Sequence, residues 1–374
     1  MVSENDLVDI FHGRGYVMVT IRELSARCGL SISAVSKALN NYSDISAKTR
    51  EHVLRTAGEM GYVPNVMARA LKTNRSFNIG VLLDDEDHHG LLHHFFVQVL
   101  ESFRTGVEGQ GYDLTLMNHN VGSKQISYLE HYRYRNLDGV FIACMDFADP
   151  ELLELASSDI PLVTIDHPYE ERAVVFSDNL NGIMSAVRYA AQAGHTKIAY
   201  INGAPSDVTA RRIQGYRTAM EGLGLPVPAG YLVQSRYRDI PLTRKVTADL
   251  LRLSDPPTCI LMPDDYAALG GMAAIREAGL LVPRDVSVIG YDGMEILKYW
   301  EPRLATIKQD TQSLGRHAAE LLLEQIEKRS QANEDKQVTV PAAFIQGKSV
   351  AAPPRAALKT DPNSAMPRAK NACG

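Results

Sequence analysis

The sequence predicts two parts: a small all-helical headpiece of the helix-turn-helix type with a hinge helix, and a larger α/β body of two lobes built on parallel sheets. Short capped helix patterns near the N-terminus indicate the headpiece. Alternating strand and helix patterns indicate the body, and their number is too large for one sheet. The expected boundaries are 1–17 for an N-terminal extension, 18–64 for the headpiece, 65–76 for the hinge helix and linker, 77–347 for the body and 348–374 for a disordered tail.

Residues 20–40 predict two short helices joined by a turn of about four residues. Thr20 can cap the first helix with Glu23 as its capping-box partner, and Gly29 can end it. Ser31 can cap the second helix. Its outward side chains are short and polar with one cation, as expected of side chains that read base edges in a major groove. These are Ile32, Ser33, Ser36, Lys37 and Asn40. Two ordinary surface helices are the alternative.

The continuation favours a DNA-binding headpiece. Ser46 can cap a third helix at Ala47–Met60, and Gly61 can end it. After Pro64, Asn65 can cap a fourth segment, Val66–Lys72. Two turns of helix are too short to be stable alone, so this segment is expected to order when it docks on a partner.

The headpiece resembles that of the LacI family of bacterial transcription regulators. The matching motifs are Thr20-Ile21-x-Glu23-Leu24-x-x-x-Cys28-Gly29-Leu30-Ser31, Ala34-Val35-Ser36-Lys37-Ala38-Leu39-Asn40, Ser46-x-x-Thr49-Arg50 and Gly61-Tyr62-x-Pro64-Asn65. The resemblance implies that the second helix lies in the major groove, and that the hinge folds on operator DNA and inserts a leucine into the minor groove. It places DNA contacts at Thr20, Ser31, Ile32, Ser33, Ser36, Lys37, Asn40, Ser46, Thr49, Asn65, Ala68 and Leu71.

Two of these positions carry specific expectations. Leu71 would be the minor-groove wedge. Lys37 stands where the family often has arginine, so a guanine contact is expected without the bidentate fork of a guanidinium group.

The charge distribution agrees with a DNA-binding head on a sensor body. The whole chain has a net charge of −5. Residues 18–76 contain nine Lys and Arg against four acidic residues, a net of +5, so the remainder carries −10.

The body is predicted as strands that alternate with helices. Expected strands are Ile79–Leu83, Asp113–Met117, Gly139–Ala143, Leu162–Ile165, Val174–Phe176, Lys197–Ile201, Thr258–Met262 and Val286–Ile289. Expected helices are His94–Glu108, Leu180–Ala193, Arg212–Leu223, Leu242–Leu253 and Ala267–Ala278. Val338–Phe344 predicts a last strand, in which Pro341 would suit only a sheet edge. From Lys348 the chain lacks periodicity and leucine heptads, which predicts a disordered tail.

The resemblance to the LacI family continues to about Gln346. Its motifs here include Gly194-His195-x-x-Ile198-Ala199, Arg212-x-x-Gly215-Tyr216, Asp264-Asp265-Tyr266-Ala267-Ala268-Leu269-Gly270 and Ser287-Val288-Ile289-Gly290-Tyr291-Asp292. It implies a two-lobed sensor, similar to periplasmic sugar-binding proteins, with an effector held between the lobes.

The acidic candidate effector ligands follow the predicted strands, where doubly wound sheets bind small molecules. Carboxylates and a guanidinium group there can hydrogen-bond the hydroxyls of a sugar, and an aromatic ring can stack on its apolar face. The candidates are Asp84, Asp85, Phe96, Asp166, Arg211, Arg212, Tyr237, Asp264 and Asp292. Alternatively, some of these acids cap the helices that follow. Asp264-Asp265 replaces the family's usual Asn-Asp, and Asp292-Gly293 its frequent Asp-Asp, which leaves the effector open.

We expect no metal and no cofactor. His89 and His93 have helical spacing, but a polar loop at the cleft mouth is the preferred interpretation. The four cysteines, Cys28, Cys144, Cys259 and Cys373, are far apart and indicate neither a zinc site nor a disulfide framework. Nucleophile-elbow, P-loop, dinucleotide-binding and zinc-protease motifs are absent from the sequence, so an enzyme is not expected.

The sequence therefore predicts a cytoplasmic repressor that acts as a homodimer on a near-palindromic operator and responds to a small effector, expected to be a sugar. No signal peptide or membrane-spanning run is visible. Residues 1–17 match no family pattern and leave the start open between Met1 and Met18. The alternatives are a corepressor-dependent regulator that responds to a purine or a phosphoprotein, and a stand-alone sugar-binding protein.

Overall fold

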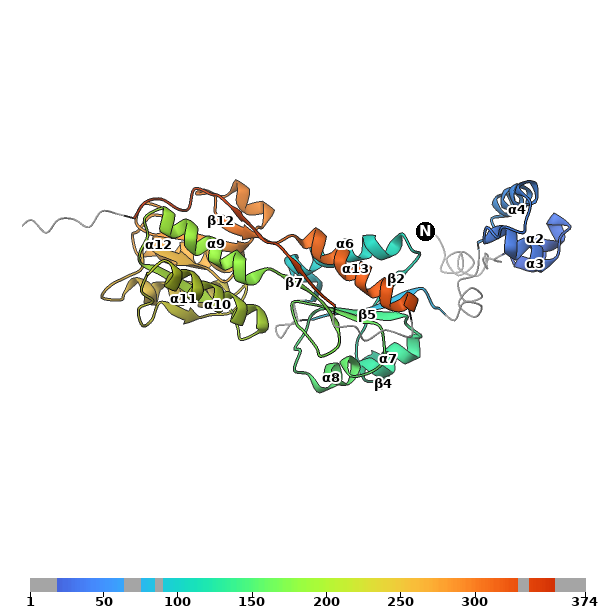
Figure 1. The fold of residues 1–374 in the computed structure, drawn as a ribbon, viewed down its shortest axis with the longest axis horizontal. Helices are drawn as coiled ribbons and strands as arrows, with labels where there is room; N and C mark the ends of the chain where they lie inside the picture. The colour runs from blue at the N-terminus through green and yellow to red at the C-terminus, as the bar shows by residue number, and fades with distance from the viewer. Residues whose placement is uncertain (1–18, 64–74, 85–89, 329–335, 354–374) are drawn as a thin grey trace, which may run out of the picture. The chain divides into compact units, whose positions relative to one another are not determined.

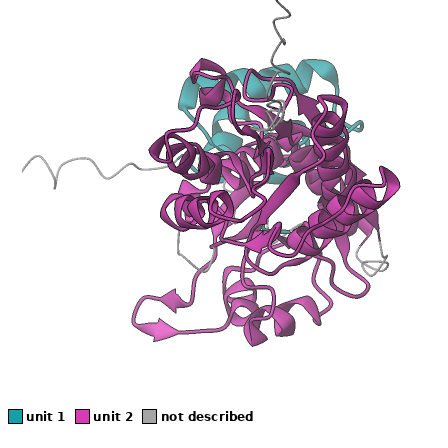
Figure 2. Cartoon of the chain, turned by 90° about the vertical axis from the view of Figure 1, so that its left-hand side faces the viewer, with its two compact units in different colours: residues 1–77 teal, residues 78–374 magenta. Residues whose placement is uncertain are grey.

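The computed structural model describes residues 19–63, 75–84, 90–328 and 336–353, which form two compact units, 1–77 and 78–374 (Figures 1 and 2). Several predicted features lie outside the described residues. They are the hinge Val66–Lys72 with Asn65, Ala68 and Leu71, then Asp85, His89 and the chain from 354 onward.

The headpiece is a three-helix unit, as predicted: α2 (Ile21–Cys28), α3 (Ile32–Leu39) and α4 (Ala47–Met60). The local sequence fixes its helix ends. Thr20 and Glu23 form the capping box, Ser31 and Ser46 cap the next two helices, and Gly29 ends α2 with φ 66°. Side chains from all three helices form the buried core of the headpiece: Leu24, Cys28, Val35, Ala38, Val53 and Ala57.

The first lobe of the body is built on a six-stranded sheet in the order β13-β7-β6-β5-β1-β2, parallel throughout. Its strands are β1 (Asn78–Leu83), β2 (Asp113–Leu116), β5 (Gly139–Cys144), β6 (Leu162–Ile165), β7 (Ala173–Ser177) and β13 (Gln337–Val340). Helices α6 (His94–Glu108) and α13 (Thr311–Lys328) pack together on one face, where Phe103 stacks on Phe141 at 4.2 Å. Helices α7 (Tyr128–Arg135) and α8 (Pro150–Ala156) share the core of the other face. Short elements η1 (Gly90–Leu92), β3 (Asn120–Val121) and β4 (Lys124–Gln125) complete the lobe.

The second lobe repeats this plan in the order β14-β12-β11-β10-β8-β9, where only β14 is antiparallel. Its strands are β8 (Ile198–Asn202), β9 (Leu232–Gln234), β10 (Cys259–Leu261), β11 (Ser287–Asp292), β12 (Ala305–Lys308) and β14 (Ala343–Ile345). Alternate strand residues face two separate cores. One includes α9 (Asn179–Gln192) and α10 (Asp207–Gly222), and the other includes α11 (Ile240–Leu251) and α12 (Asp265–Glu277). Figure 1 labels these four helices. A short helix, η2 (Glu295–Tyr299), follows β11.

The predicted body elements are present. The helix His94–Glu108 and the strand Leu162–Ile165 have their predicted bounds, whereas the ends of the others are shifted; for example, the helix expected from Arg212 begins earlier, at Asp207. Helices α7, α8 and α13 and strands β3, β4, β9 and β12 are additional. The prediction of one last strand at Val338–Phe344 is wrong. Pro341 separates β13, in the first sheet, from β14, in the second, because proline has no N–H to donate to a sheet ladder.

The predicted start of a disordered tail at Lys348 is also wrong. Ser349 is fully buried, and its hydroxyl donates to Val288 O at 2.6 Å and accepts from Ala305 N at 2.8 Å. The carbonyl of Ala351 lies 2.8 Å from the ring Nε2 of His195. Residues 348–353 therefore pack on the second lobe through specific hydrogen bonds, which low periodicity cannot reveal.

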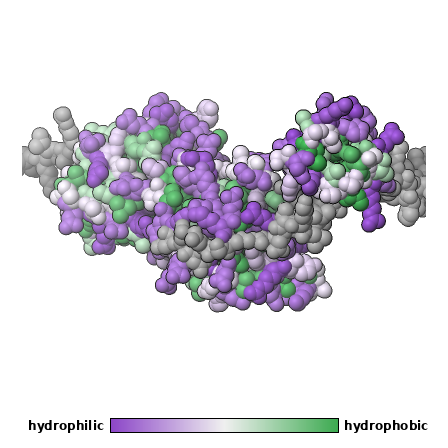
Figure 3. Space-filling model, turned by 45° about the vertical axis from the view of Figure 1, so that its right-hand side comes forward, coloured by the Kyte–Doolittle hydropathy of each residue, from purple (hydrophilic) through white to green (hydrophobic). Residues whose placement is uncertain are grey.

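Hydrophilic residues cover most of the face of the described parts that Figure 3 shows, with hydrophobic residues scattered among them. Among the described residues, no helix is both long and apolar enough to span a membrane.

The contact between α6 and α13 generates a stability prediction. A Cβ atom at Gly315 would lie 2.3 Å from the carbonyl oxygen of Val99 and 2.6 Å from the amide nitrogen of Phe103. Gly315→Ala should therefore force the helices apart and lower the free energy of unfolding by about 1–3 kcal/mol. Urea unfolding of the full chain, followed by circular dichroism, measures the change. Gly222→Ala is the control, because a Cβ there meets nothing within 4 Å; equal stabilities of the two variants would contradict the close approach.

Candidate functional site

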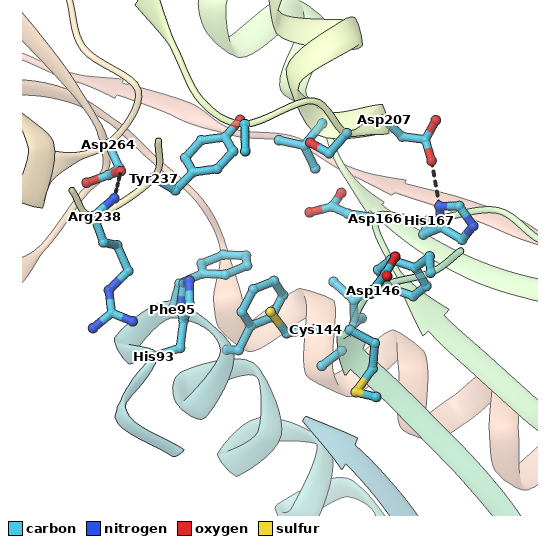
Figure 4. A pocket seen from close by; sticks show the side chains of 18 of the residues that line it. His93, Phe95, Cys144, Asp146, Asp166, His167, Asp207, Tyr237, Arg238 and Asp264 are labelled. Carbon is cyan, nitrogen blue, oxygen red and sulfur yellow. Dashed lines mark hydrogen bonds and ion pairs between the residues drawn. The ribbon is translucent and has the colours of Figure 1, made fainter. Parts of the chain in front are cut away.

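A cavity of about 590 Å³ lies between the two lobes at the carboxyl ends of their strands (Figure 4). The first lobe contributes the start of α6 and the residues after β5 and β6. The second lobe contributes the residues after β8, β9, β10 and β12 and the end of β11. This is the position at which open α/β sheets bind ligands.

Six of the nine predicted effector ligands line this cavity: Phe96, Asp166, Arg212, Tyr237, Asp264 and Asp292. Two do not. The amide of Asp84 donates to Cys144 O at 2.7 Å, and the Arg211 guanidinium lies 4.0 Å from the centroid of the Phe176 ring. Asp85 lies outside the described residues.

Arg212 is the buried cation of the site, with 3% of its surface exposed. Its Nε donates to Asn179 Oδ1 at 2.7 Å and its Nη1 to Pro263 O at 2.9 Å. The guanidinium plane also lies over the Tyr291 ring, 3.5 Å from its centroid. The protein therefore fixes this group before any ligand arrives.

Two buried carboxylates accept hydrogen bonds from the protein. Asp166 Oδ1 accepts from the amide of Ser177 at 2.8 Å, and burial raises the pKa of Asp166 to about 6. Asp264 caps α12 by accepting from the amide of Ala267 at 2.8 Å, and its other oxygen accepts from the amide of Arg238 at 2.6 Å. Burial also raises the pKa of Asp264. For Asp264, the alternative role as a helix cap is confirmed.

Asp292 ends β11 with φ 106°, a conformation that side-chain-bearing residues rarely adopt. Its Oδ1 accepts from Nε2 of Gln309 at 2.7 Å. Burial raises the pKa of Asp292 to about 7 despite the opposing charge of Arg212, and the charge of Asp264 adds to the rise. The side chain is half-buried, so its carboxylate can face both the protein and a ligand.

Aromatic rings form the apolar walls of the cavity. Phe147 and His167 stack at 4.2 Å with an interplanar angle of 15°. Phe95 and Phe96 meet edge to face at 4.9 Å, and the hydroxyl of Tyr237 shares a 2.7 Å hydrogen bond with Thr209. The site can thus hold a small molecule that has both a flat apolar face and polar edges.

Two contacts join the lobes at the cavity. His167 Nδ1 lies 2.6 Å from Asp207 Oδ2 (Figure 4). Arg238 Nη2 donates to Leu92 O at 3.2 Å. The sequence reasoning missed His167, Asp207 and Arg238. His167 directly follows Asp166 at a strand end, so the same rule applied one residue further would have included it.

The described ranges contain no group of three or more His, Cys, Asp or Glu side chains placed to hold a metal ion. Of the histidines considered, His89 is outside these ranges.

On the headpiece, the outward side of α3 carries the predicted base readers. Ile32 is 44% exposed and Ser33 is exposed, whereas Ser36 is half-buried. Lys37 forms an ion pair with Asp44, and Asn40 Nδ2 donates to Ser36 O at 2.7 Å. The other predicted contacts among the described residues, Thr20, Ser31, Ser46 and Thr49, lie at helix N-termini, where the first three are N-caps.

Two protein-family profiles match parts of this chain. The profile of the family described as "Bacterial regulatory proteins, lacI family" matches residues 20–65, and that of the "Periplasmic binding protein-like domain" matches residues 187–350. The HTH-type transcriptional repressor PurR of Vibrio parahaemolyticus serotype O3:K6 is 33% identical over 83% of this chain and 92% of its own length.

Solved structures show the same arrangement. The lac repressor dimer bound to operator and the anti-inducer ONPF is 25% identical with a TM-score of 0.74, over 90% of this chain and 100% of that one. A LacI family regulator from Enterococcus faecium with bound ribose is 26% identical with a TM-score of 0.62, over 74% of this chain and 99% of that one.

Together, the capped three-helix headpiece, the two lobes around one cavity and these relatives identify the molecule. The family is not enzymatic, which agrees with the lack of catalytic motifs. The chain belongs to the LacI family and is a DNA-binding transcriptional repressor with an effector-binding domain.

Proposed function

We propose that the protein is a cytoplasmic homodimeric repressor whose affinity for its operator is controlled by a sugar bound between the lobes. One observation carries the proposal: the fixed guanidinium of Arg212 shares one cavity with the carboxylates of Asp166 and Asp292. Charged acceptors and donors placed in this way can form strong hydrogen bonds to several hydroxyls at once.

The aromatic walls complete the argument for a sugar. A pyranose or furanose ring has an apolar face that can lie on Tyr237 or Phe96, while its hydroxyls reach the charged groups. The relative from Enterococcus faecium, which was solved with bound ribose, supports the same class.

A corepressor with a flat ring, such as a purine base, is the second candidate. The stacked pair of Phe147 and His167, which lines the cavity, favours it, because aromatic side chains interact well with another planar ring. A thermal-shift screen of pentoses, hexoses, disaccharides and purine bases on the purified protein separates the two classes. Stabilisation by a purine alone would remove the sugar proposal.

Operator binding is proposed to use the outward face of α3 and the hinge. Ile32, Ser33 and Lys37 would read base edges, and capped helix N-termini near Ser31 and Ser46 would meet phosphates. Enrichment of binding duplexes from a random DNA pool by the full chain tests this role and yields the operator. A repressor of this kind should select a near-palindrome, because a two-fold dimer presents two equal headpieces.

The charge of Asp292 generates a prediction about the effector. With a pKa of about 7, Asp292 is mostly ionised at pH 8 and mostly protonated at pH 6. Affinity for a sugar that donates a hydrogen bond to the ionised form should therefore fall about tenfold between pH 8 and pH 6. Asp292→Asn should lower the affinity at pH 8 about tenfold or more and remove most of this pH dependence. Calorimetric titration with the best sugar from the screen measures both effects.

Asp84→Asn is the matched control, because Asp84 also follows a strand but does not line the cavity. Its affinity and pH profile should equal those of the wild type. Unchanged binding by Asp292→Asn would remove Asp292 from the effector site.

The proposed dimer generates a second prediction. Ile296, Tyr299 and Trp300, at η2, are 64%, 86% and 46% exposed, an unusual concentration of large apolar surface. The lac repressor, which was solved as a dimer on operator, supports self-association of this chain, and we propose that this surface takes part in it. Tyr299→Asp should raise the dimer dissociation constant at least about tenfold, since it would place a charge in an apolar contact. Analytical ultracentrifugation measures this constant, and Tyr134→Asp, at a tyrosine that is 65% exposed on α7, should leave it unchanged.

The hinge generates a third prediction, which rests on the sequence alone because Val66–Lys72 lies outside the described residues. We propose that two copies of Leu71 enter the minor groove at the operator centre and unstack one base step. Leu71→Ala should weaken operator binding and reduce DNA bending together. Bending is measured by energy transfer between dyes at the two duplex ends. If the Leu71→Ala variant bends the DNA as much as the wild type does, the residue that enters the minor groove is not Leu71.

A further inference from the structure

Lys37 is the cation of α3, and the structure shows that it is paired. Its Nζ donates to Oδ2 of Asp44, which lies in the loop between α3 and α4. The hydrogen bond raises the pKa of the Lys37 amine and lowers the pKa of the Asp44 carboxyl, so both groups are ionised at neutral pH. The two side chains are 41% and 53% exposed, which leaves both accessible to DNA.

The loop holds Asp44 in place beside α3. The amide of Tyr42 donates to Lys37 O at 3.1 Å, and the amide of Ile45 donates to Tyr42 O at 3.4 Å. Arg50, on α4, donates from Nη2 to the same Tyr42 oxygen at 2.7 Å. Since aspartate has a short side chain, a fixed backbone also fixes the region that its carboxylate can reach.

We propose that Asp44 is a positioning residue for Lys37 and a determinant of the headpiece's specificity, because it directs the Lys37 ammonium to uncharged base edges and withholds it from phosphates. This inference rests on the proposed role of α3 in reading the operator. An ammonium group has three donors, so Lys37 can keep its bond to Asp44 and still donate to O6 and N7 of a guanine.

A phosphate group is a less favourable partner than guanine for the paired Lys37 ammonium. Any phosphate oxygen that approaches Lys37 also approaches the Asp44 carboxylate, well within the distance over which charges interact at physiological salt. The two anions repel each other, whereas a base edge carries no net charge. The pair therefore favours base contacts over the sequence-independent phosphate contacts that dominate binding to random DNA.

The charges on the rest of the headpiece complement the proposed preference of Lys37 for bases over phosphates. The sequence of α3, ISAVSKAL, contains no other charged residue, so the ion pair leaves the reading helix close to neutral. Other headpiece cations, such as Arg22 and Arg27, remain to attract the DNA backbone. Attraction of the DNA backbone and reading of the bases therefore depend on different side chains.

The test compares the full-length wild type with Asp44→Asn on two duplexes: the operator enriched from the random pool, and a scrambled duplex of the same length. Fluorescence anisotropy gives the binding constants between 50 and 200 mM KCl, a range in which each phosphate contact steepens the slope of log K against log salt by about 0.9. We expect Asp44→Asn to bind the scrambled duplex about three- to tenfold more tightly, with a slope steeper by about 0.9 as Lys37 gains a phosphate. The ratio of operator to scrambled affinity should fall by a similar factor.

Glu59→Gln is the charge-matched control. It also removes a headpiece carboxylate next to a basic side chain, since Glu59 lies 3.9 Å from Arg55, but it lies on α4. Glu59→Gln should change the affinities for the two duplexes by the same factor and leave both salt slopes as they are in the wild type. Asp44→Glu, which restores the carboxylate, should recover most of the wild-type ratio.

The double variant isolates the coupling to Lys37. In a Lys37→Ala background, Asp44→Asn should no longer alter the ratio or the slope on scrambled DNA. An effect of the same size in that background would overturn the proposal, because Asp44 would then repel DNA directly. An unchanged ratio and slope in the single variant would overturn it as well. If the wild type binds the enriched and the scrambled duplexes equally tightly, the proposed operator-reading function is itself wrong, and this result is distinct from a failure of the role of Asp44.

Discussion

The hydrogen bond between Arg212 and Asn179 is the interaction on which the effector site depends. A buried guanidinium without acceptors would be very unfavourable, and Asn179 supplies one of the two acceptors that hold it. Asn179 lies where the chain passes from β7 into the second lobe, and its Nδ2 also approaches Asp166 Oδ1 at 3.3 Å. One amide therefore joins a cation of the second lobe to a carboxylate of the first. A ligand that engages either charge acts directly on the connection between the lobes.

The contacts at the cavity rim define how such a ligand could act. The His167–Asp207 pair and the Arg238–Leu92 bond already connect the lobes. In Figure 4, Arg238 lies on the opposite side of the cavity from His167 and Asp207. Closure therefore does not require new cross-lobe contacts from the protein. An effector can shift the arrangement only through a difference in its affinity for the open and closed forms. The charged groups in the cavity, whose pKa values depend on burial, are the natural source of that difference.

The sequence predicted best what local chemistry determines. The headpiece caps at Thr20, Ser31 and Ser46 depend on neighbours within four residues, and all three are confirmed. The strand-end rule found three cavity residues, Asp166, Asp264 and Asp292, because parallel strands place their carboxyl ends together. Contacts between distant segments were not predictable in this way. The burial of Ser349 depends on Val288 and Ala305, and the division of the last strand at Pro341 depends on which sheet each half meets.

The chain crosses between the lobes after β7, β12 and β13, and this has a consequence for its synthesis on the ribosome. The second lobe interrupts the first, which receives α13 and its edge strand β13 only from residues 311–340. Until then, this face of the first sheet is covered by α6 alone, and the side of α6 that packs on α13 lacks its partner helix. The nascent first lobe therefore presents an apolar surface while more than a hundred further residues are translated, and messages truncated before α13 should yield aggregation-prone chains.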